Sequence, residues 1–447
     1  MENSIFTRKQ IRALVIPLII EQLLASLMGT VDTMMVSAAG SAAISAVSLV
    51  DAINVLIIHV FSALAAGGSI ICAQYLGRGD RREANETGRQ LILCVTLLSS
   101  AVMIAFIALR SPMLRLIFGS VEPDVMSSAQ VYLLITALSY PFIALYNAGA
   151  ALFRVDGNSR LPMAVSTICN LINIGGNVLL IFTFKMGAAG AALSTLASRV
   201  LSAVAVLCFL RQEKQTIVVR DYFSIRPQMK RIWNIMAVGV PTGVENGMFQ
   251  FGKLVIQSTV STLGTAAIAG QAMTQLLELL ASNAAMGVGI ALMTVAGRLL
   301  GAGMIAEARA ATRRLCLWAE GTVVIMCVLI ALGVAPLTRL CALEPEAAAI
   351  TVQLTLIICA VKPFIWMTAF IPAYALRAAG DVRFTMLVSS ITMWSCRVVV
   401  SVVLMRAFHM GPLGMWIGMF SDWFVRSVIF LARFHGDKWT RRRVIGE

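Results

Sequence analysis

Charged side chains are scarce in this sequence. Of its 447 residues only 13% are Asp, Glu, Lys or Arg, whereas 59% are hydrophobic. Soluble domains average about 25% charged and about 45–50% apolar residues. Apolar stretches near the roughly 20 residues that a membrane-spanning helix needs follow one another along nearly the whole chain. The shortage of charge therefore excludes a soluble globular fold and predicts an all-α integral membrane protein.

Histidine and paired cysteine are also lacking. The three histidines, His59, His409 and His435, form no cluster, and the nine cysteines are scattered without a C-x-x-C pair. A metal site held by such residues needs clustered ligands, so we expect none, and we interpret the cysteines as small core residues. No connection between apolar stretches holds the clustered His, Asp or Ser chemistry of a membrane enzyme. We therefore expect no enzyme and no cofactor.

Apolar runs and helix-breaking residues predict twelve membrane-spanning helices. They are expected at 13–37, 51–76, 88–109, 126–151, 162–184, 188–210, 232–262, 273–300, 312–334, 348–376, 385–405 and 412–433. Most Lys and Arg residues lie in the two terminal segments and in the even-numbered connections. By the positive-inside rule both termini are then cytoplasmic, which requires an even number of spans. Because these loops account for the net charge of +14, we expect no nucleic-acid binding.

The sequence repeats itself at a nearly constant offset. Pro17 and Glu21 return as Pro241 and Glu245. Further matches in the same order, at an offset of 224 or 223, pair Gly40 with Gly264, Gly77 with Gly301, Gly79 with Gly303, Glu83 with Glu307, Arg154 with Arg377, Gly157 with Gly380 and Gly187 with Gly411. A duplication of six helices, an even number, gives two pseudo-symmetric lobes in a parallel repeat.

The repeat and the loop charges together predict the domain organisation. We expect an N-lobe at 1–210, a basic cytoplasmic linker between the lobes at 211–231, and a C-lobe at 232–447. The C-lobe ends in a basic tail that includes Arg441 to Arg443.

Ionisable side chains inside spans are the candidate functional residues, because each costs about 2.5–3.5 kcal/mol to insert. Glu21 and Glu245 each follow a proline by four residues, and that proline frees a backbone carbonyl beside the carboxylate. This combination favours handling of a cation or a proton. Glu245, Asn246, Gln250 and Lys253 also form one polar stripe on helix 232–262, and a buried Glu245–Lys253 pair is the alternative interpretation.

The other intramembrane charges have simpler interpretations available. Glu278, on helix 273–300, is kept as a candidate for substrate or proton binding. Asp422 and Arg426 are spaced to form an i, i+4 pair, Asp51 is expected near the membrane edge, and Glu320 is expected to face a neighbouring helix. Lys362 and Arg397 complete the set.

Asp32 is the strongest candidate for binding a coupling ion. It lies eleven residues after Glu21, about three helical turns, so the two are expected to share a face. Asn173 and Asn177, one turn apart on helix 162–184, and the hydroxyl of Thr195 could meet it. Such an oxygen set suits either an alkali cation or a hydrogen-bonded proton, and Asp32 is its one titratable member.

At these residues the chain resembles the multidrug and toxic compound extrusion (MATE) family. The similarity covers nearly the whole chain and includes Val31-Asp32-Thr33, the Gln74-Tyr-Leu-Gly77 end of helix 51–76, Asn173 with Asn177, and the G-A-A-x-x-T pattern at Gly190 to Thr195. The family exports organic cations and other toxic compounds in exchange for sodium or protons. The resemblance implies a plasma-membrane antiporter, which we expect to be a monomer, and a cation-coupling role for Asp32, Asn173, Asn177 and Thr195.

Two departures from the family pattern leave details open. Many members have Asp where this chain has Asn177, so the coupling ion is not determined. Members with a glutamate on the helix that corresponds to 232–262 often place it two turns after the proline, whereas Glu245 follows Pro241 by one, so its role is inferred from its own chemistry.

A lipid-linked oligosaccharide flippase of the same superfamily is the alternative function. It would need a larger, cationic cavity for the pyrophosphate group of its substrate. Lys253, Lys362 and Arg397 keep this alternative open, although the intramembrane candidates as a whole lean acidic.

Overall fold

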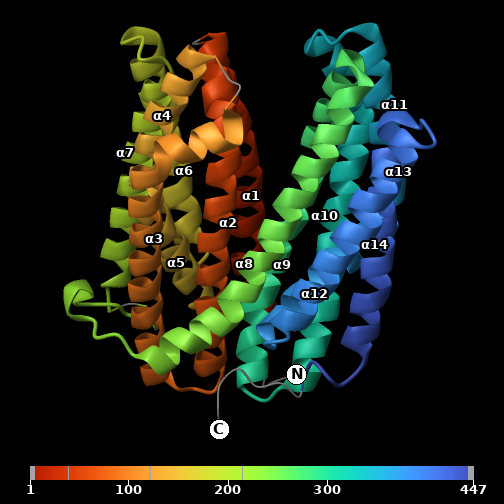
Figure 1. Cartoon of the computed structure of the whole chain (residues 1–447). Helices are drawn as coiled ribbons and strands as arrows, with labels where there is room; N and C mark the ends of the chain where they lie inside the picture. Colours follow the sequence, from red (N-terminus) through yellow and green to blue (C-terminus); the bar gives the residue numbers. More distant parts are fainter. Residues whose placement is uncertain (1–5, 39, 120–121, 214, 441–447) are drawn as a thin grey trace. The chain divides into compact units, whose positions relative to one another are not determined.

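The computed structural model describes residues 6–38, 40–119, 122–213 and 215–440 (Figure 1). Within these residues the regular structure is entirely helical. The α-helices are α1 (Arg8–Ser37), α2 (Ser41–Gly77), α3 (Arg81–Phe118), α4 (Pro123–Leu138), α5 (Tyr140–Val155), α6 (Arg160–Asn177), α7 (Gly187–Leu210), α8 (Met229–Val260), α9 (Thr265–Gly301), α10 (Ile305–Leu340), α11 (Pro345–Ala378), α12 (Val382–Thr392), α13 (Val400–Arg406) and α14 (Gly411–His435). The predicted all-α class is confirmed. Long apolar segments favour this outcome because a helix satisfies its own backbone hydrogen bonds in lipid.

Four short helical segments of other types accompany the α-helices. They are the π-helices η1 (Val178–Thr183) and η4 (Met393–Val399) and the 3-10 helices η2 (Tyr222–Ser224) and η3 (Ser261–Leu263). The π-helix η1 continues α6, and η4 joins α12 to α13. The predicted spans 162–184 and 385–405 are therefore single rods with a π-helical stretch inside them.

Apolar length alone identifies ten spans among the described residues, or eleven if the bent pair α4 and α5 is one span. The chain is thus a multi-pass membrane protein. The 32-residue helix α8 is not among these spans, and its polar stripe, which includes Glu245, Gln250 and Lys253, lowers its hydropathy. The count of twelve spans and the cytoplasmic side of the termini remain predictions.

Several helix boundaries differ from prediction. Helix α2 begins at Ser41 rather than 51, and α9 begins at Thr265 rather than 273. Both early segments are rich in alanine and contain an isoleucine, so the predicted starts cut these helices short. The predicted helix 126–151 is two helices bent by 42° at Ser139. Pro141, in the first turn of α5, has no N–H to continue the hydrogen bonds of α4, which explains the break.

The sequence repeat is also a repeat of the backbone. The eight described glycines with positive φ form four pairs: Gly40 with Gly264, Gly79 with Gly303, Gly157 with Gly380, and Gly187 with Gly411. Paired angles are similar, for example 91° and 88° at the third pair and 55° and 59° at the fourth. Even Lys185 and His409, which the repeat also pairs, share positive φ values of 54° and 51°. Because this region favours glycine, the two lobes turn at the same places, and the predicted repeat is confirmed.

Contacts divide the chain into two compact units. Here the N-terminal unit is Leu24–Gly243, and the C-terminal unit is Met1–Leu23 with Val244–Glu447. Both boundaries fall inside equivalent helices, α1 and α8. The first half of α1 therefore belongs with α9, α10, α11 and α14, and the first half of α8 belongs with the helices of the first repeat. The predicted lobes 1–210 and 232–447 were defined by the sequence repeat, whereas these units are defined by which residues pack together.

Close helix contacts hold each exchanged half-helix in its unit. In the C-terminal unit Leu14, Val15 and Leu18 of α1 are buried in the main hydrophobic core. A Cβ added at Gly287 of α9 would lie 2.8 Å from the backbone oxygen of Leu18. In the N-terminal unit a Cβ at Gly67 of α2 would lie 2.7 Å from the backbone nitrogen of Gly239 in α8. Glycine is required at both crossings because backbone meets backbone.

The segment between α7 and α8 is fastened to the N-terminal unit. Within it Val219 is fully buried, and the backbone N–H of Val218 donates to Asn85 Oδ1 at 2.9 Å. The backbone N–H of Gln228 donates to Gln90 Oε1, also at 2.9 Å. The hydroxyl of Tyr222 donates to the carbonyl of Leu207 at 2.7 Å, and burial raises the pKa of this tyrosine to about 12. The predicted basic tail at Arg441 to Arg443 lies outside the described residues.

Candidate functional site

Asp32 lies at the end of a chain of hydrogen bonds in the N-terminal unit. Its Oδ1 accepts a short hydrogen bond from Asn177 Nδ2. Asn177, fully buried at the end of α6, also reaches Asn173 Oδ1 at 3.5 Å. Asn173 Nδ2 in turn donates to the hydroxyls of Ser194 and Thr195 on α7, each at 3.3 Å. The structure thus brings together the four residues predicted for cation coupling and adds Ser194 to them.

The buried amide of Asn177 has one acceptor left over. Its Oδ1 is buried and has no hydrogen-bond partner among the described residues. Buried polar atoms are nearly always bonded, so such an atom calls for an explanation. Together with the carboxylate of Asp32 and the hydroxyl of Thr195, it provides oxygen atoms of the kind that bind a hard cation.

A second polar network adjoins this chain. Asp51 Oδ1 accepts hydrogen bonds from Tyr132 Oη at 3.1 Å and from Asn54 Nδ2 at 3.0 Å. The hydroxyl of Tyr140 donates to Asn54 Oδ1 at 2.8 Å. Asp51 also interacts electrostatically with Asp32. Asp51 is thus bonded to side chains of α2 and α4, and its position at the membrane edge stays a prediction.

Arg199 of α7 is a further charged residue near these carboxylates, and it was not among the predicted site residues. Its Nη1 donates to Ser139 Oγ at 2.7 Å, and its guanidinium interacts electrostatically with both Asp32 and Asp51. An arginine in the middle of the apolar run 188–210 has the same insertion cost that singled out the carboxylates. That signal was available in the sequence.

The charged residues of the polar stripe on α8 have partners other than those of the predicted Glu245–Lys253 pair. Glu245 is buried, with 7% of its surface exposed, and its Oε1 accepts from Arg377 Nη2 at 2.7 Å. The expected Glu245–Lys253 pair is therefore not formed. Lys253 Nζ instead lies 4.8 Å from the centre of the Phe249 ring, which also has the guanidinium of Arg397 at 4.9 Å. Asn246 and Gln250, on the same stripe, are part-buried.

Glu278 belongs to a closed ion pair. Lys362 Nζ, fully buried, donates to Glu278 Oε1 at 2.7 Å and to Ser282 Oγ at 2.6 Å. Ser282 Oγ also donates to Glu278 Oε1 at 2.6 Å. This ion pair joins α9 to α11 through Oε1 of Glu278, and a role of Glu278 in substrate or proton binding stays a prediction.

Asp422 of α14 joins two arginines. Arg426 Nη2 donates to its Oδ1 at 3.0 Å, as the i, i+4 spacing predicted. Arg397 Nη2 lies 2.8 Å from its Oδ2, which is ion-pair distance without the angle of a hydrogen bond. Arg397 lies within the π-helix η4, a type of segment that often marks functional sites.

Glu21 and Glu320 are the remaining carboxylates among the candidate residues. Glu21, 7% exposed, belongs to the C-terminal unit, whereas Asp32 of the same helix belongs to the N-terminal unit. Glu21 and Asp32, which were expected to share one face of a helix, therefore belong to two different units. Glu320 of α10 is half-buried, and its Oε2 has no hydrogen-bond partner among the described residues.

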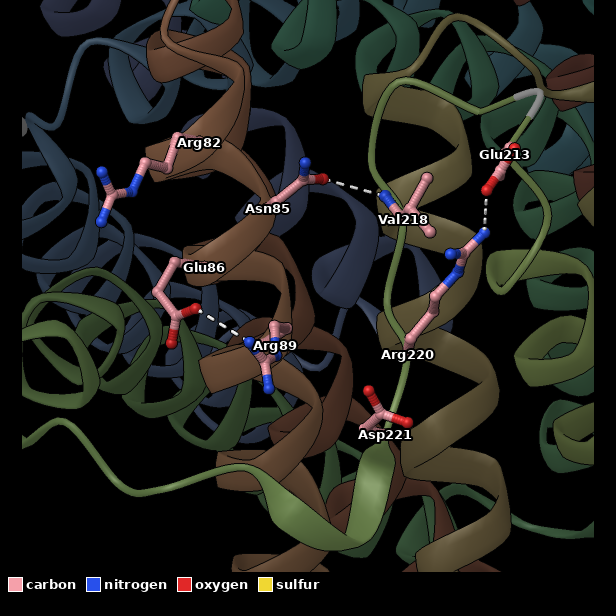
Figure 2. Close-up of a pocket in the computed structure, with 8 residues that line it drawn as sticks. All are labelled: Arg82, Asn85, Glu86, Arg89, Glu213, Val218, Arg220 and Asp221. Carbon is pink, nitrogen blue, oxygen red and sulfur yellow. Dashed lines mark hydrogen bonds and ion pairs between the residues drawn. The ribbon is translucent and has the colours of Figure 1, made fainter.

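A pocket of about 810 Å³ lies elsewhere, between the start of α3 and the linker (Figure 2). Its charges largely cancel: Arg89 pairs with Glu86 at 3.4 Å, and Arg220 pairs with Glu213 at 2.7 Å. The Arg220 guanidinium holds the pKa of Glu213 below its usual value. None of the predicted site residues lines this pocket, so we assign it no part in transport.

Comparisons of the sequence and of the fold with known proteins agree with one another. The sequence model of the MatE family matches residues 17–179 and 241–403, one segment in each repeat. The chain is 27% identical to a probable multidrug resistance protein NorM of Thermotoga maritima, over 98% of this chain and 94% of that protein. It is 22% identical to multidrug and toxin extrusion protein 1 of Oryctolagus cuniculus, over 97% and 76%. Its fold matches, with a TM-score of 0.86, 20% identity and coverage of 98% and 95%, a structure described as an outward-facing multidrug resistance MATE family transporter.

Proposed function

This chain belongs to the MatE family, and we propose that it exports organic cations and other toxic small molecules across the plasma membrane in exchange for Na⁺ or H⁺. The single observation that carries the coupling mechanism is the hydrogen bond from Asn177 to Asp32, continued through Asn173 to Thr195. It connects one titratable carboxylate to neutral oxygen ligands on α6 and α7.

A proton would act at Asp32 by changing the direction of its hydrogen bonds. The charged carboxylate accepts from Asn177 Nδ2, as observed. A protonated carboxyl still accepts at its carbonyl oxygen but also gains an O–H donor, so it needs one further acceptor. The unbonded Oδ1 of Asn177 can supply it after rotation of the amide by half a turn. Protonation would thus rotate a buried side chain at the junction of α6 and η1.

A sodium ion would act at the same place by gathering oxygens. Asp32, the Oδ1 atoms of Asn173 and Asn177, and Thr195 Oγ1 are the available ligands, and carboxylate, carbonyl and hydroxyl oxygens suit hard cations. To bind the ion, Asn177 would again turn its oxygen toward Asp32. Either ion therefore has the same consequence, which is neutralisation of Asp32 and reorientation of Asn177.

The energy available from this step can be compared with the energy that alternating access needs. An ionised side chain within the bilayer costs about 2.5–3.5 kcal/mol on insertion scales, and more by other estimates. Moving a two-state equilibrium from 1:99 to 99:1 takes about 5.5 kcal/mol of differential binding. Neutralising Asp32, with its neighbours Asp51 and Arg199 responding, contributes a large part of that.

In this proposal the stripe of α8 contacts the substrate. Phe249, Gln250 and Lys253 are part-buried and combine an aromatic ring with polar groups. Glu245 orients the stripe through its ion pair with Arg377, which anchors α8 to α11. The methionines of this region, such as Met248 and Met286, add soft surface that accommodates varied molecules.

The flippase alternative is less well supported by these contacts. Of the three cations it depends on, Lys362 is closed off by Glu278 and Ser282, and Arg397 is held at Asp422. Only Lys253 has no carboxylate within 4.0 Å among the described residues. A pyrophosphate group would need several accessible cations.

Proteoliposomes test the proposal directly. Purified protein is reconstituted into vesicles loaded with ethidium, and dye movement is followed under a Na⁺ gradient, a H⁺ gradient or neither. We expect one gradient to drive transport and Asp32→Asn to abolish that drive. Ethidium movement that neither gradient alters would contradict antiport, and absence of movement for a panel of organic cations would contradict drug export.

A further inference from the structure

We infer that Arg199 is a positioning residue that transmits the charge state of Asp32 to the bend between α4 and α5. The inference rests on the proposed function, in which an ion neutralises Asp32, and it assigns the step that follows inside the N-terminal unit. Arg199 is held at the bend through Ser139, while Asp32 and Asp51 both attract it. A change of charge at Asp32 therefore changes the force on a side chain that is tied to the bend.

Arg199 is shared by two carboxylates and paired with neither. Asp32 and Asp51 interact with it electrostatically, yet neither forms an ion pair with it within 4.0 Å among the residues that the structure describes. Its Nη1 instead donates to Ser139 Oγ at 2.7 Å. Thr195, a proposed ligand of the coupling ion, precedes Arg199 by one turn of α7, so the two start from the same face. A charge attracted from two directions and fixed to neither carboxylate can shift when one attraction is lost.

Ser139 lies at the bend itself. The helices α4 and α5 meet at this residue and are bent by 42°. Ser139 is fully buried, and its Oγ also donates to the carbonyl of Thr136 at 2.6 Å. Pro141 lacks the N–H that would continue the helical hydrogen bonds across the junction. Side-chain hydrogen bonds therefore support a junction at which the backbone pattern is interrupted.

Two tyrosines on either side of the bend are tied to α2. Tyr132 Oη donates to Asp51 Oδ1 at 3.1 Å, and Tyr140 Oη donates to Asn54 Oδ1 at 2.8 Å. Asn54 Nδ2 donates to the same oxygen of Asp51 at 3.0 Å, which joins these bonds into one network. The bend is thus held from α2 by this network and from α7 by Arg199.

Neutralisation of Asp32 has a defined consequence in this arrangement. The charged carboxylate of Asp32 balances the attraction of Asp51 for Arg199. Once an ion neutralises Asp32, Asp51 is the carboxylate that still attracts the guanidinium, and the pull draws Arg199 away from its hydrogen bond with Ser139. The bend then loses its support from α7. Positions at the ends of helices, such as Ser139, are where hinges absorb changes of backbone angle.

Hydrogen–deuterium exchange of the full-length protein in detergent tests the inference, because peptides that cover 136–143 report local opening at the bend. Asp32→Asn mimics the neutralised carboxyl at nearly constant shape. We expect it to speed exchange of this segment by about 5- to 150-fold, the range usual for coupled sites. Ser139→Ala keeps every charge but removes the tie to Arg199. In that background Asp32→Asn should leave exchange of the segment unchanged.

Two further substitutions distinguish positioning from packing. Arg199→Lys keeps the cation, so the response of the bend to Asp32→Asn should persist in it, whereas Arg199→Gln should remove the response. The Ser139→Ala experiment keeps the test decisive if Arg199→Gln does not fold. Ser99→Ala is the matched control, because Ser99 is also fully buried and bonds only within its own helix α3 among the described residues. The response to Asp32→Asn should be unaltered in that background.

An unchanged bend in Asp32→Asn, or the same response in the wild-type and Ser139→Ala backgrounds, would overturn the inference. Ethidium export by the same preparations is measured in parallel under an ion gradient. If Asp32→Asn still abolishes gradient-driven export, the proposed function stands without Arg199 as its transmitter, so the two failures are distinguishable.

Discussion

Where the first repeat has Asp32, the second has Ile256 at the equivalent position, and where the first has Asn173, the second has Arg397. Ile256 is buried in an apolar core, whereas Asp32 is bonded to Asn177. The described intramembrane network of the N-terminal unit contains two carboxylates and one guanidinium, those of Asp32, Asp51 and Arg199. The network around Phe249 in the C-terminal unit contains four cations and two carboxylates, those of Lys253, Lys362, Arg397, Arg426, Glu278 and Asp422.

This comparison shows which features the two repeats share and which differ between them. Paired glycines keep the same turns in both repeats, so the backbone plan is shared. Buried charges are not tied to that plan, because only their local partners must balance them. The N-terminal unit could therefore take on the proposed binding of a coupling cation while the buried charges of the C-terminal unit diverged. The following predictions test that division, from the largest expected effect to the smallest.

Substituting Asp32→Asn should abolish ion-driven ethidium export at equal expression. The change removes the one titratable member of the hydrogen-bonded chain, while Asn keeps a similar shape. Ethidium efflux from cells is the measurement. Thr33→Val, at an exposed neighbouring position that bonds only within its own helix, should export normally. Ethidium efflux by Asp32→Asn at the wild-type rate would contradict the proposed coupling role of Asp32 in the N-terminal unit.

Substituting Lys362→Met should lower stability by about 3–5 kcal/mol, because it leaves Glu278 charged and unpaired in a buried site. At the position equivalent to Glu278 the first repeat has Asn54. Asn54→Ala, which removes the hydrogen bonds of Asn54 with Tyr140 and Asp51 but leaves no new unpaired cation, should cost less, about 1–3 kcal/mol. Thermal unfolding in detergent gives the ranking.

The double substitution Lys362→Met with Glu278→Met is the control for that experiment. Removing both charges should restore most of the lost stability, since a buried ion pair replaced by apolar residues is often nearly neutral. Equal stability of the Lys362→Met single and double variants would mean that the ion pair is not what holds this region together.

Substituting Gly67→Ala and Gly287→Ala should each destabilise the protein by about 1–3 kcal/mol. Each added Cβ would lie under 3.0 Å from backbone atoms of the exchanged half-helix, α8 in one unit and α1 in the other. Gly29→Ala, where nothing lies within 4 Å, is the control and should not destabilise. Unfolding midpoints that fall for only one of the two crossings would show that the units differ in packing as well as in charge.

Substituting Glu83→Gln should lower stability by about 1 kcal/mol or less, because Arg231 loses a surface ion pair at 2.8 Å. Its repeat counterpart Glu307 forms no ion pair among the described residues, so Glu307→Gln should have no effect. Differential scanning fluorimetry of the two variants side by side measures the difference. A larger loss for Glu307→Gln would contradict the expectation that the ion pair of Glu83 with Arg231 accounts for the difference.

Much of the fold could be predicted from the sequence because it depends on local properties. Long apolar runs, turn glycines at a constant offset, and proline positions identified the helices and the duplication. The break at Ser139 was missed because Pro141 lies inside an otherwise continuous apolar run. The early starts of α2 and α9 were missed because the predicted spans began at Asp51 and Met273, although the alanine-rich segments before them continue the helices.

The candidate site could be predicted only in part. Asp32, Asn173, Asn177 and Thr195 were identified from their positions on separate helices, and they do lie within one hydrogen-bonded chain. Arg199 was overlooked although its insertion cost is readable from the sequence. Tyr132 has no such signal, because a tyrosine in a span is usually ordinary packing.

Composition, hydropathy and the constant offset between the repeats determined by themselves that this is a duplicated, multi-pass helical membrane protein, because these are properties of the chain read in order. Tertiary structure decided which charges meet. Glu245 pairs with Arg377, far along the sequence on α11, and not with Lys253 two turns along its own helix. An ion pair requires two atoms within about 4 Å, and only the packing of distant helices sets that distance. The unbalanced cations beside Phe249 became visible for the same reason.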